Sequence, residues 1–146
     1  MENEASGGWI YVLMTSADYG RYKVGRTTEN PLIRFKALRT GDPYLGLQVA
    51  YFIPNSLGEI SRVEADIHRS LEARIFFHDE KASEWFTGNI DEAIAWIESL
   101  FADWWGDGIV TDWFRPGLRK VTRYYEEGLL SRFGPPSQLD EYGIPW

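Results

Sequence analysis

The chain has 146 residues, of which 44% are hydrophobic and 16% aromatic, and it contains no cysteine. This length fits one domain with a buried core, and the absence of thiols excludes a disulfide framework, a cysteine nucleophile and a cysteine-based zinc site. The N-terminus is small and acidic, and no apolar run approaches the ~18 residues of a membrane span, so we expect a cytoplasmic protein without signal peptide or membrane segment.

The net charge of −7 is unevenly distributed along the chain. Residues 1–75 contain nine basic and nine acidic side chains, whereas residues 76–146 contain six and thirteen. Positions 21–39 hold six basic side chains against one acidic one, namely Arg21, Lys23, Arg26, Arg34, Lys36 and Arg39 against Glu29. Such a patch suffices to hold a phosphate backbone, because the relevant field acts within a Debye length of ~8–10 Å. A solvated basic face would have the same composition.

The N-terminal half predicts two paired strands, a helix and a third strand. Residues 9–15 and 22–27 are rich in β-formers and flank a turn, which predicts an antiparallel hairpin. Asn30 followed by Pro31 is a typical helix start. Residues 47–53 are nearly all apolar and predict a central strand.

The middle of the chain predicts a second helix and a short extended segment. Apolar spacing predicts a helix over residues 58–74, with Glu64 and His68 one turn apart at the edge of its buried face. A polar loop over residues 76–83 precedes the extended residues 84–86, whose two aromatic side chains we expect to be buried.

The C-terminal part predicts further helices. Asn89 is a cap for a helix over residues 90–104. Residues 117–133 show the spacing of an amphipathic helix, and residues 134–146 are expected to be irregular. The many aromatic side chains in this part favour packing against the domain over a partner surface. The predicted fold class is therefore α+β, a small three-stranded, mainly antiparallel sheet flanked by helices, with a C-terminal helical extension.

The N-terminal hairpin resembles the signature of the GIY-YIG nuclease superfamily, named after Gly-Ile-Tyr on one strand and Tyr-Ile-Gly on the next. In this chain the two elements are Trp9-Ile10-Tyr11 and Lys23-Val24-Gly25, with eleven residues between Tyr11 and Lys23. The resemblance implies an arginine on the following helix and a glutamate on a later one, and Arg34 and Glu64 match these positions. The order of the elements matches over residues 8–100.

Two residues depart from this signature. Trp9 stands where the first glycine is expected, and Lys23 stands where the second tyrosine is expected. The Lys-Val-Gly-Arg-Thr form is similar to a phage and bacterial subgroup in which this lysine is usual. The resemblance implies a GIY-YIG-like nuclease domain over residues 1–105, with residues 106–146 as an aromatic extension packed on the same domain.

The resemblance implies a metal-dependent endonuclease that hydrolyses phosphodiester bonds in DNA. Glu64 would hold one largely hydrated Mg²⁺ or Mn²⁺. Tyr11 would activate or position the attacking water, and Arg34 would hold the scissile phosphate through its fork of N–H donors. Lys23 would favour the tyrosine phenolate electrostatically or hold a non-bridging oxygen.

The other polar side chains have two interpretations each. His68 would contact phosphate or shuttle protons, although a lone histidine is more often structural. Arg21, Arg26, Lys36 and Arg39 would contact the nucleic-acid backbone, or they are solvated charges.

Two other function classes remain open. The first is a catalytically inactive module that keeps the fold and the basic groove and acts as a regulatory protein or an inhibitor. The second is an interaction protein whose acidic, aromatic C-terminal segment binds a protein partner or forms a homodimer. For the endonuclease and the inactive module, we expect single- or double-stranded DNA as the partner.

Overall fold

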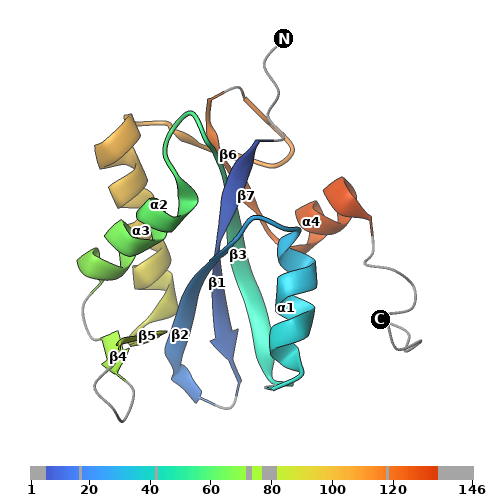
Figure 1. Cartoon of the computed structure of the whole chain (residues 1–146), viewed down its shortest axis with the longest axis vertical. Helices are drawn as coiled ribbons and strands as arrows, with labels where there is room; N and C mark the ends of the chain where they lie inside the picture. Colours follow the sequence, from blue (N-terminus) through green and yellow to red (C-terminus); the bar gives the residue numbers. More distant parts are fainter. Residues whose placement is uncertain are drawn as a thin grey trace.

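The computed structural model describes residues 6–16, 18–41, 43–71, 74–76, 82–117 and 119–134. In these residues the strands are β1 (Gly7–Thr15), β2 (Asp18–Thr27), β3 (Leu45–Pro54), β4 (Arg74–Phe76), β5 (Ala82–Thr87), β6 (Val110–Asp112) and β7 (Val121–Tyr124). The helices are α1 (Pro31–Arg39), α2 (Ile60–Ser70), α3 (Ile90–Trp105) and α4 (Glu126–Phe133). Helices α2 and α3 cover one face of the sheet, and α1 and α4 cover the other (Figure 1).

The described strands form one mixed sheet in the order β4-β5-β2-β1-β3-β7-β6. Adjacent strands run antiparallel except β6 and β7, which are parallel. The predicted hairpin is confirmed, since β1 pairs with β2 and Tyr11 lies opposite Gly25. The third predicted strand, β3, is central as expected, because it lies between β1 and β7.

The predicted fold class is wrong in the size of the sheet and in the nature of the extension. The three-stranded sheet is only the middle of a seven-stranded one, because β5 and β4 add to the edge of β2, and β7 and β6 add to that of β3. Residues 117–133 do not form one helix, since Val121–Tyr124 is strand β7 and only Glu126–Phe133 is helical. Pairing with β3 on one side and β6 on the other places Val121 and Thr122, which are β-branched, in the buried part of the sheet, and this outweighs the helical spacing.

Two further boundaries differ from the sequence prediction. The helix predicted over residues 58–74 ends at Ser70, and Arg74–Phe76 forms β4. The predicted polar loop lies mainly between β4 and β5, and its residues 77–81 lie outside the described residues, as do residues 135–146 of the predicted irregular tail.

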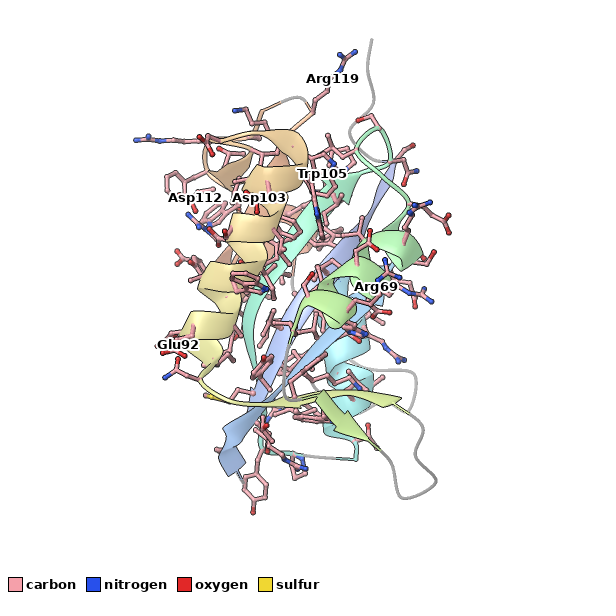
Figure 2. All side chains as sticks on the ribbon, turned by 90° about the vertical axis from the view of Figure 1, so that its left-hand side faces the viewer. Arg69, Glu92, Asp103, Trp105, Asp112 and Arg119 are labelled. Carbon is pink, nitrogen blue, oxygen red and sulfur yellow. The ribbon has the colours of Figure 1, made fainter. Side chains whose placement is uncertain are left out.

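Alternation along the strands divides the core into two clusters, one on each face of the sheet. The cluster under α2 and α3 includes Ile10, Val12, Val24, Tyr51, Ile53, Ile67, Phe86, Ile97 and Phe101. The cluster under α1 and α4 includes Trp9, Tyr11, Leu13, Leu32, Phe35, Phe52, Tyr124 and Leu129. Glu92 and Asp103 lie on the outer side of α3, away from the sheet (Figure 2). None of the helices in the described part of the chain has the length and apolar composition needed to cross a bilayer.

Local signals set the start of α1 and the ends of α3 close to where the sequence predicts them. The side-chain oxygens of Asn30 and Asn89 accept hydrogen bonds from the backbone N–H groups of Leu32 and Glu92, at 3.0 Å each. Gly106 ends α3 with a φ of +102°, which glycine adopts without a steric cost.

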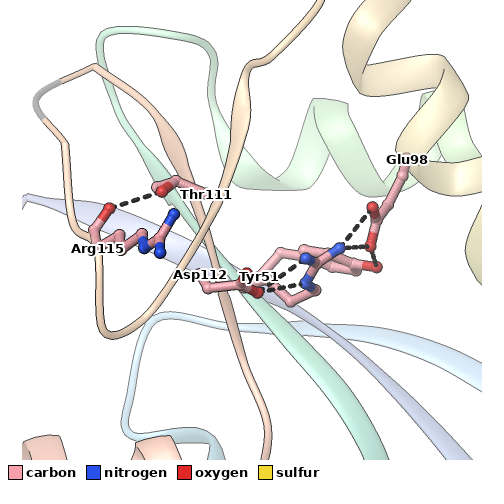
Figure 3. Close-up of polar contacts among 6 residues, drawn as sticks. Tyr51, Glu98, Thr111, Asp112 and Arg115 are labelled. Carbon is pink, nitrogen blue, oxygen red and sulfur yellow. Dashed lines mark hydrogen bonds and ion pairs between the residues drawn. The ribbon is translucent and has the colours of Figure 1, made fainter.

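A polar network joins the C-terminal strands to α3 and β3 (Figure 3). The Arg123 Nη1 atom donates to both carboxylate oxygens of Glu98, at 2.8 and 2.9 Å, and Arg123 Nε donates to Asp112 Oδ1 at 2.8 Å. The Tyr51 hydroxyl donates to Glu98 Oε2 at 2.7 Å. Burial and the adjacent Glu98 carboxylate raise the pKa of Tyr51, so its hydroxyl stays protonated and acts as a donor.

Removing the Arg123 guanidinium should therefore destabilise the fold. Arg123→Ala leaves two half-buried carboxylates without their shared donor and should lower the free energy of unfolding by about 2 kcal/mol. The control is Arg69→Ala, which breaks the exposed pair with Asp66 and should cost about 0–1 kcal/mol. Urea unfolding measures both variants, and equal losses would contradict the structural role of the network.

Candidate active site

The ring of Tyr11 lies across β2 at the position of Gly25. Tyr11 is 2% exposed, and its hydroxyl oxygen is buried. A Cβ atom at Gly25 would lie 2.4 Å from both Cζ and the hydroxyl oxygen of Tyr11, closer than any side chain tolerates. The Tyr11 ring can therefore lie over β2 only because residue 25 is a glycine.

His68, on α2, contacts Val24, the residue of β2 that precedes Gly25. Its Nε2 atom lies 2.9 Å from the carbonyl oxygen of Val24. A carbonyl only accepts, so Nε2 carries the proton in this hydrogen bond. The imidazole is buried and lies 5.3 Å from the ring of Phe86. His68 therefore fixes α2 beside β2.

Glu64 lies one helical turn before His68 and contacts Arg26, the residue of β2 that follows Gly25. Its Oε1 atom accepts a hydrogen bond from Arg26 Nε at 3.3 Å, and its Oε2 atom is buried. The Glu64 side chain is 13% exposed, whereas that of Arg26 is 47% exposed. Val24-Gly25-Arg26 is thus contacted in turn by His68, Tyr11 and Glu64.

This tripeptide lies where the pairing of β2 with β5 has ended. β5 pairs with β2 over Arg21, Tyr22 and Lys23, so the following residues form a strand edge flanked by α2. Tyr11 approaches this edge from the face covered by α1, and Glu64 approaches from the side of α2. The edge of β2 is therefore the point at which side chains from both faces meet.

Glu64 brings carboxylate oxygen atoms to this edge, and carboxylates are the protein ligands that Mg²⁺ and Mn²⁺ take. In the part of the chain that the structure describes, no three or more His, Cys, Asp or Glu side chains group as metal ligands. Arg26 occupies one of the Glu64 carboxylate oxygens. Mg²⁺ and Mn²⁺ need only one or two carboxylates, because such ions keep several waters.

Lys23 and Arg21 lie on the same face of β2 as Gly25, since side chains alternate along a strand. Lys23 pairs in register with Trp85 of β5, and its Nζ atom is 5.9 Å from the centre of the indole. The Arg21 guanidinium is 5.2 Å from the same ring. The two aromatic residues of β5 lie on opposite faces of the sheet. The prediction that both are buried is confirmed for Phe86, whereas Trp85 is only half-buried.

The three basic residues of α1 lie beside the face that carries Tyr11. Arg34 and Arg39 are exposed and Lys36 is half-buried. Arg39 Nη2 donates to the carbonyl oxygen of Pro43 at 3.1 Å and so closes the turn after the helix. The contacts around β2 thus place His68, Tyr11 and Glu64 on three successive residues of that strand. Arg34 is exposed on α1, the helix on the same face of the sheet as Tyr11.

The C-terminal extension accounts for Trp9 at a position where a glycine was expected. The indole is buried and packs edge-on against Phe52 and Tyr124, with ring centres 5.2 and 5.1 Å away. The guanidinium of Arg132, from α4, lies 5.2 Å from the indole. Trp9 is therefore part of the surface on which β7 and α4 pack.

A methyl group at position 25 should displace the Tyr11 ring. Gly25→Ala should cost about 1–3 kcal/mol of unfolding free energy, the usual cost of overpacking, and this cost should fall by about 1 kcal/mol or more in a Tyr11→Ala background. Gly41→Ala is the control, because the nearest atom to its added Cβ is 3.8 Å away. Equal costs in both backgrounds would contradict the packing.

The role of His68 as an anchor can be separated from a role in proton transfer. His68→Ala leaves the Val24 carbonyl without this donor and should lower the unfolding free energy by about 1–3 kcal/mol. His68→Gln should recover part of the loss, because its amide donates from a similar position. Thermal and urea unfolding check both variants, and full stability of His68→Ala would refute the anchoring role.

Residues 8–101 match the family model of the T5orf172 domain, a phage domain family of GIY-YIG-like, endonuclease type. The match covers β1 to β5 and most of α3, and it leaves out β6, β7 and α4. No curated protein and no solved structure matches the chain. The family indicates a nuclease-like or DNA-binding function. The chain belongs to the T5orf172 domain family.

Proposed function

We propose that this protein is a metal-dependent endonuclease that hydrolyses DNA phosphodiester bonds at the edge of β2. The observation that supports this most strongly is the convergence of Tyr11 and Glu64 on Gly25 and Arg26, adjacent residues of one strand. This arrangement combines a phenol, a carboxylate and a guanidinium. Those three groups serve the needs of the reaction, which are a positioned water, a cation site and a phosphate contact.

Glu64 is the residue that would hold the divalent ion. When bound, the ion supplies positive charge that stabilises the charge developing on the phosphate. The ion pair with Arg26 keeps the carboxylate in one orientation, and the buried Oε2 atom is shielded from bulk water. Burial strengthens electrostatic interactions at this position relative to those in water.

Tyr11 positions the attacking water through its hydroxyl group. The ring is fixed between β1 and β2, so the hydroxyl is held in place before substrate arrives. Lys23 lies two residues from Gly25 on the same face and supplies a positive charge to a non-bridging phosphate oxygen. His68 acts as a positioning residue, because it holds α2, and with it Glu64, against β2.

Arginine side chains on two elements hold the DNA backbone. Arg26 uses one N–H for Glu64 and has further donors that face solvent, since its side chain is 47% exposed. Arg34, exposed on α1, holds the scissile phosphate through its fork of donors. Lys36 and Arg39 on the same helix extend this positive surface.

One observation favours a second candidate function. Arg26 already neutralises Glu64, so a cation would have to compete with the guanidinium for the carboxylate. If the Arg26 guanidinium keeps the Glu64 carboxylate, the domain would bind DNA without cleaving it. It would then serve as a regulatory or inhibitory protein.

Cleavage assays distinguish the two functions. The purified protein should nick supercoiled plasmid or cut single-stranded DNA with Mg²⁺ or Mn²⁺ and should be inactive in EDTA. Glu64→Gln and Tyr11→Phe should each lower the rate about 100-fold or more, because each removes a group that acts on the reacting atoms. Glu92→Gln, an exposed carboxylate on α3, is the matched control and should keep its activity.

Two outcomes would count against the proposal. Cleavage at the normal rate in both Glu64→Gln and Tyr11→Phe would show that the site lies elsewhere. DNA binding without cleavage under any metal condition would support the binding module instead.

A further inference from the structure

The sheet face that carries Tyr11 continues past Gly25 over β2 and β5. Arg21 and Lys23 lie on this face of β2, and Trp85 lies on it next to Lys23. Helix α1 packs against β3, and α2 and α3 pack against β2 from the opposite face. This part of the face therefore lies to one side of α1 and carries two cations and an indole.

Trp85 differs from the aromatic residue that follows it. Phe86 is fully buried in the cluster under α2 and α3, whereas Trp85 stays half-buried on the other face. The Arg21 guanidinium and the Lys23 ammonium lie 5.2 and 5.9 Å from the indole centre. Thr87, opposite Arg21 in the strand pairing, is exposed.

Packing accounts for only part of this arrangement. The indole contacts the cluster that includes Tyr11 and Leu13, which explains its buried portion. The Arg21 and Lys23 cations beside the ring add positive charge to this face. An aromatic ring with neighbouring cations on a partly exposed sheet face is a common way in which proteins hold unpaired bases, with the bases stacked on the ring and the phosphates on the cations.

We propose that Trp85 stacks on an unpaired base next to the scissile phosphodiester, with Arg21 and Lys23 holding the adjacent phosphates. This inference rests on the proposed function and specifies its substrate as DNA that offers an unpaired nucleotide. Lys23 and Gly25 are two residues apart, about 7 Å along the strand. A strand stacked on Trp85 thus brings a neighbouring phosphate to the position of Tyr11.

The test is DNA binding by the full chain in EDTA, measured by fluorescence anisotropy with a labelled single strand and with the matching blunt duplex. Trp85→Ala should weaken single-strand binding about tenfold, in line with the loss of one base–aromatic stack, and should change duplex binding less than about twofold. Trp85→Phe should keep most of the affinity and Trp85→Leu should lose it, because only phenylalanine offers a π face. Trp96→Ala, an exposed tryptophan on α3, is the control and should change neither affinity.

Each alternative outcome has a defined meaning. Equal weakening of single-strand and duplex binding by Trp85→Ala, or unchanged binding in both, would overturn the stacking role while leaving the proposed function intact. Binding of neither DNA by the wild-type chain would overturn the stacking role and the proposed function together. If Trp85→Ala fails to fold, the comparison of Trp85→Phe with Trp85→Leu decides the question.

Discussion

The close packing of the Tyr11 ring on Gly25 is the constraint on which the candidate site depends. A Cβ at position 25 would occupy the space of the phenol, so any other residue there would push the tyrosine out of its place. Helix α2 contacts the residues on either side of Gly25. His68 lies against the Val24 carbonyl, and Glu64 pairs with Arg26. The site thus lies at the edge of a strand at which two layers of the protein meet.

The C-terminal extension completes the sheet and stabilises the face on which Tyr11 lies. The Arg132 guanidinium is surrounded by Trp9, Phe52, Tyr124 and Phe133, with ring centres 4.8 to 5.6 Å away. Cation–π contacts of this kind bind α4 to the N-terminal strand and to β3. The departure of Trp9 from the family signature is therefore explained by packing, and it leaves the chemistry proposed for Tyr11 unaffected.

Local signals could be predicted from the sequence, and long-range pairing could not. The caps at Asn30 and Asn89 depend on adjacent residues, and the hairpin depends on two short β-rich segments around a turn, so both were predicted. The spacing of residues 117–133 does not reveal β7, because Val121–Tyr124 becomes a strand by pairing with β6 and with β3, about seventy residues earlier. Tyr11 and Glu64 could be proposed from motif order, but the half-buried position of Trp85 depends on how β5 pairs with β2.

The most direct test of the site is the location of a bound Mn²⁺ ion, measured by paramagnetic broadening of backbone amide signals in NMR spectra. If Glu64 holds the ion at the edge of β2, small amounts of Mn²⁺ should broaden the signals of Gly25, Arg26 and Glu64 first. This broadening should disappear in Glu64→Gln. Broadening that is centred on the acidic start of α3, at Asp91 and Glu92, or that persists in Glu64→Gln, would contradict the account.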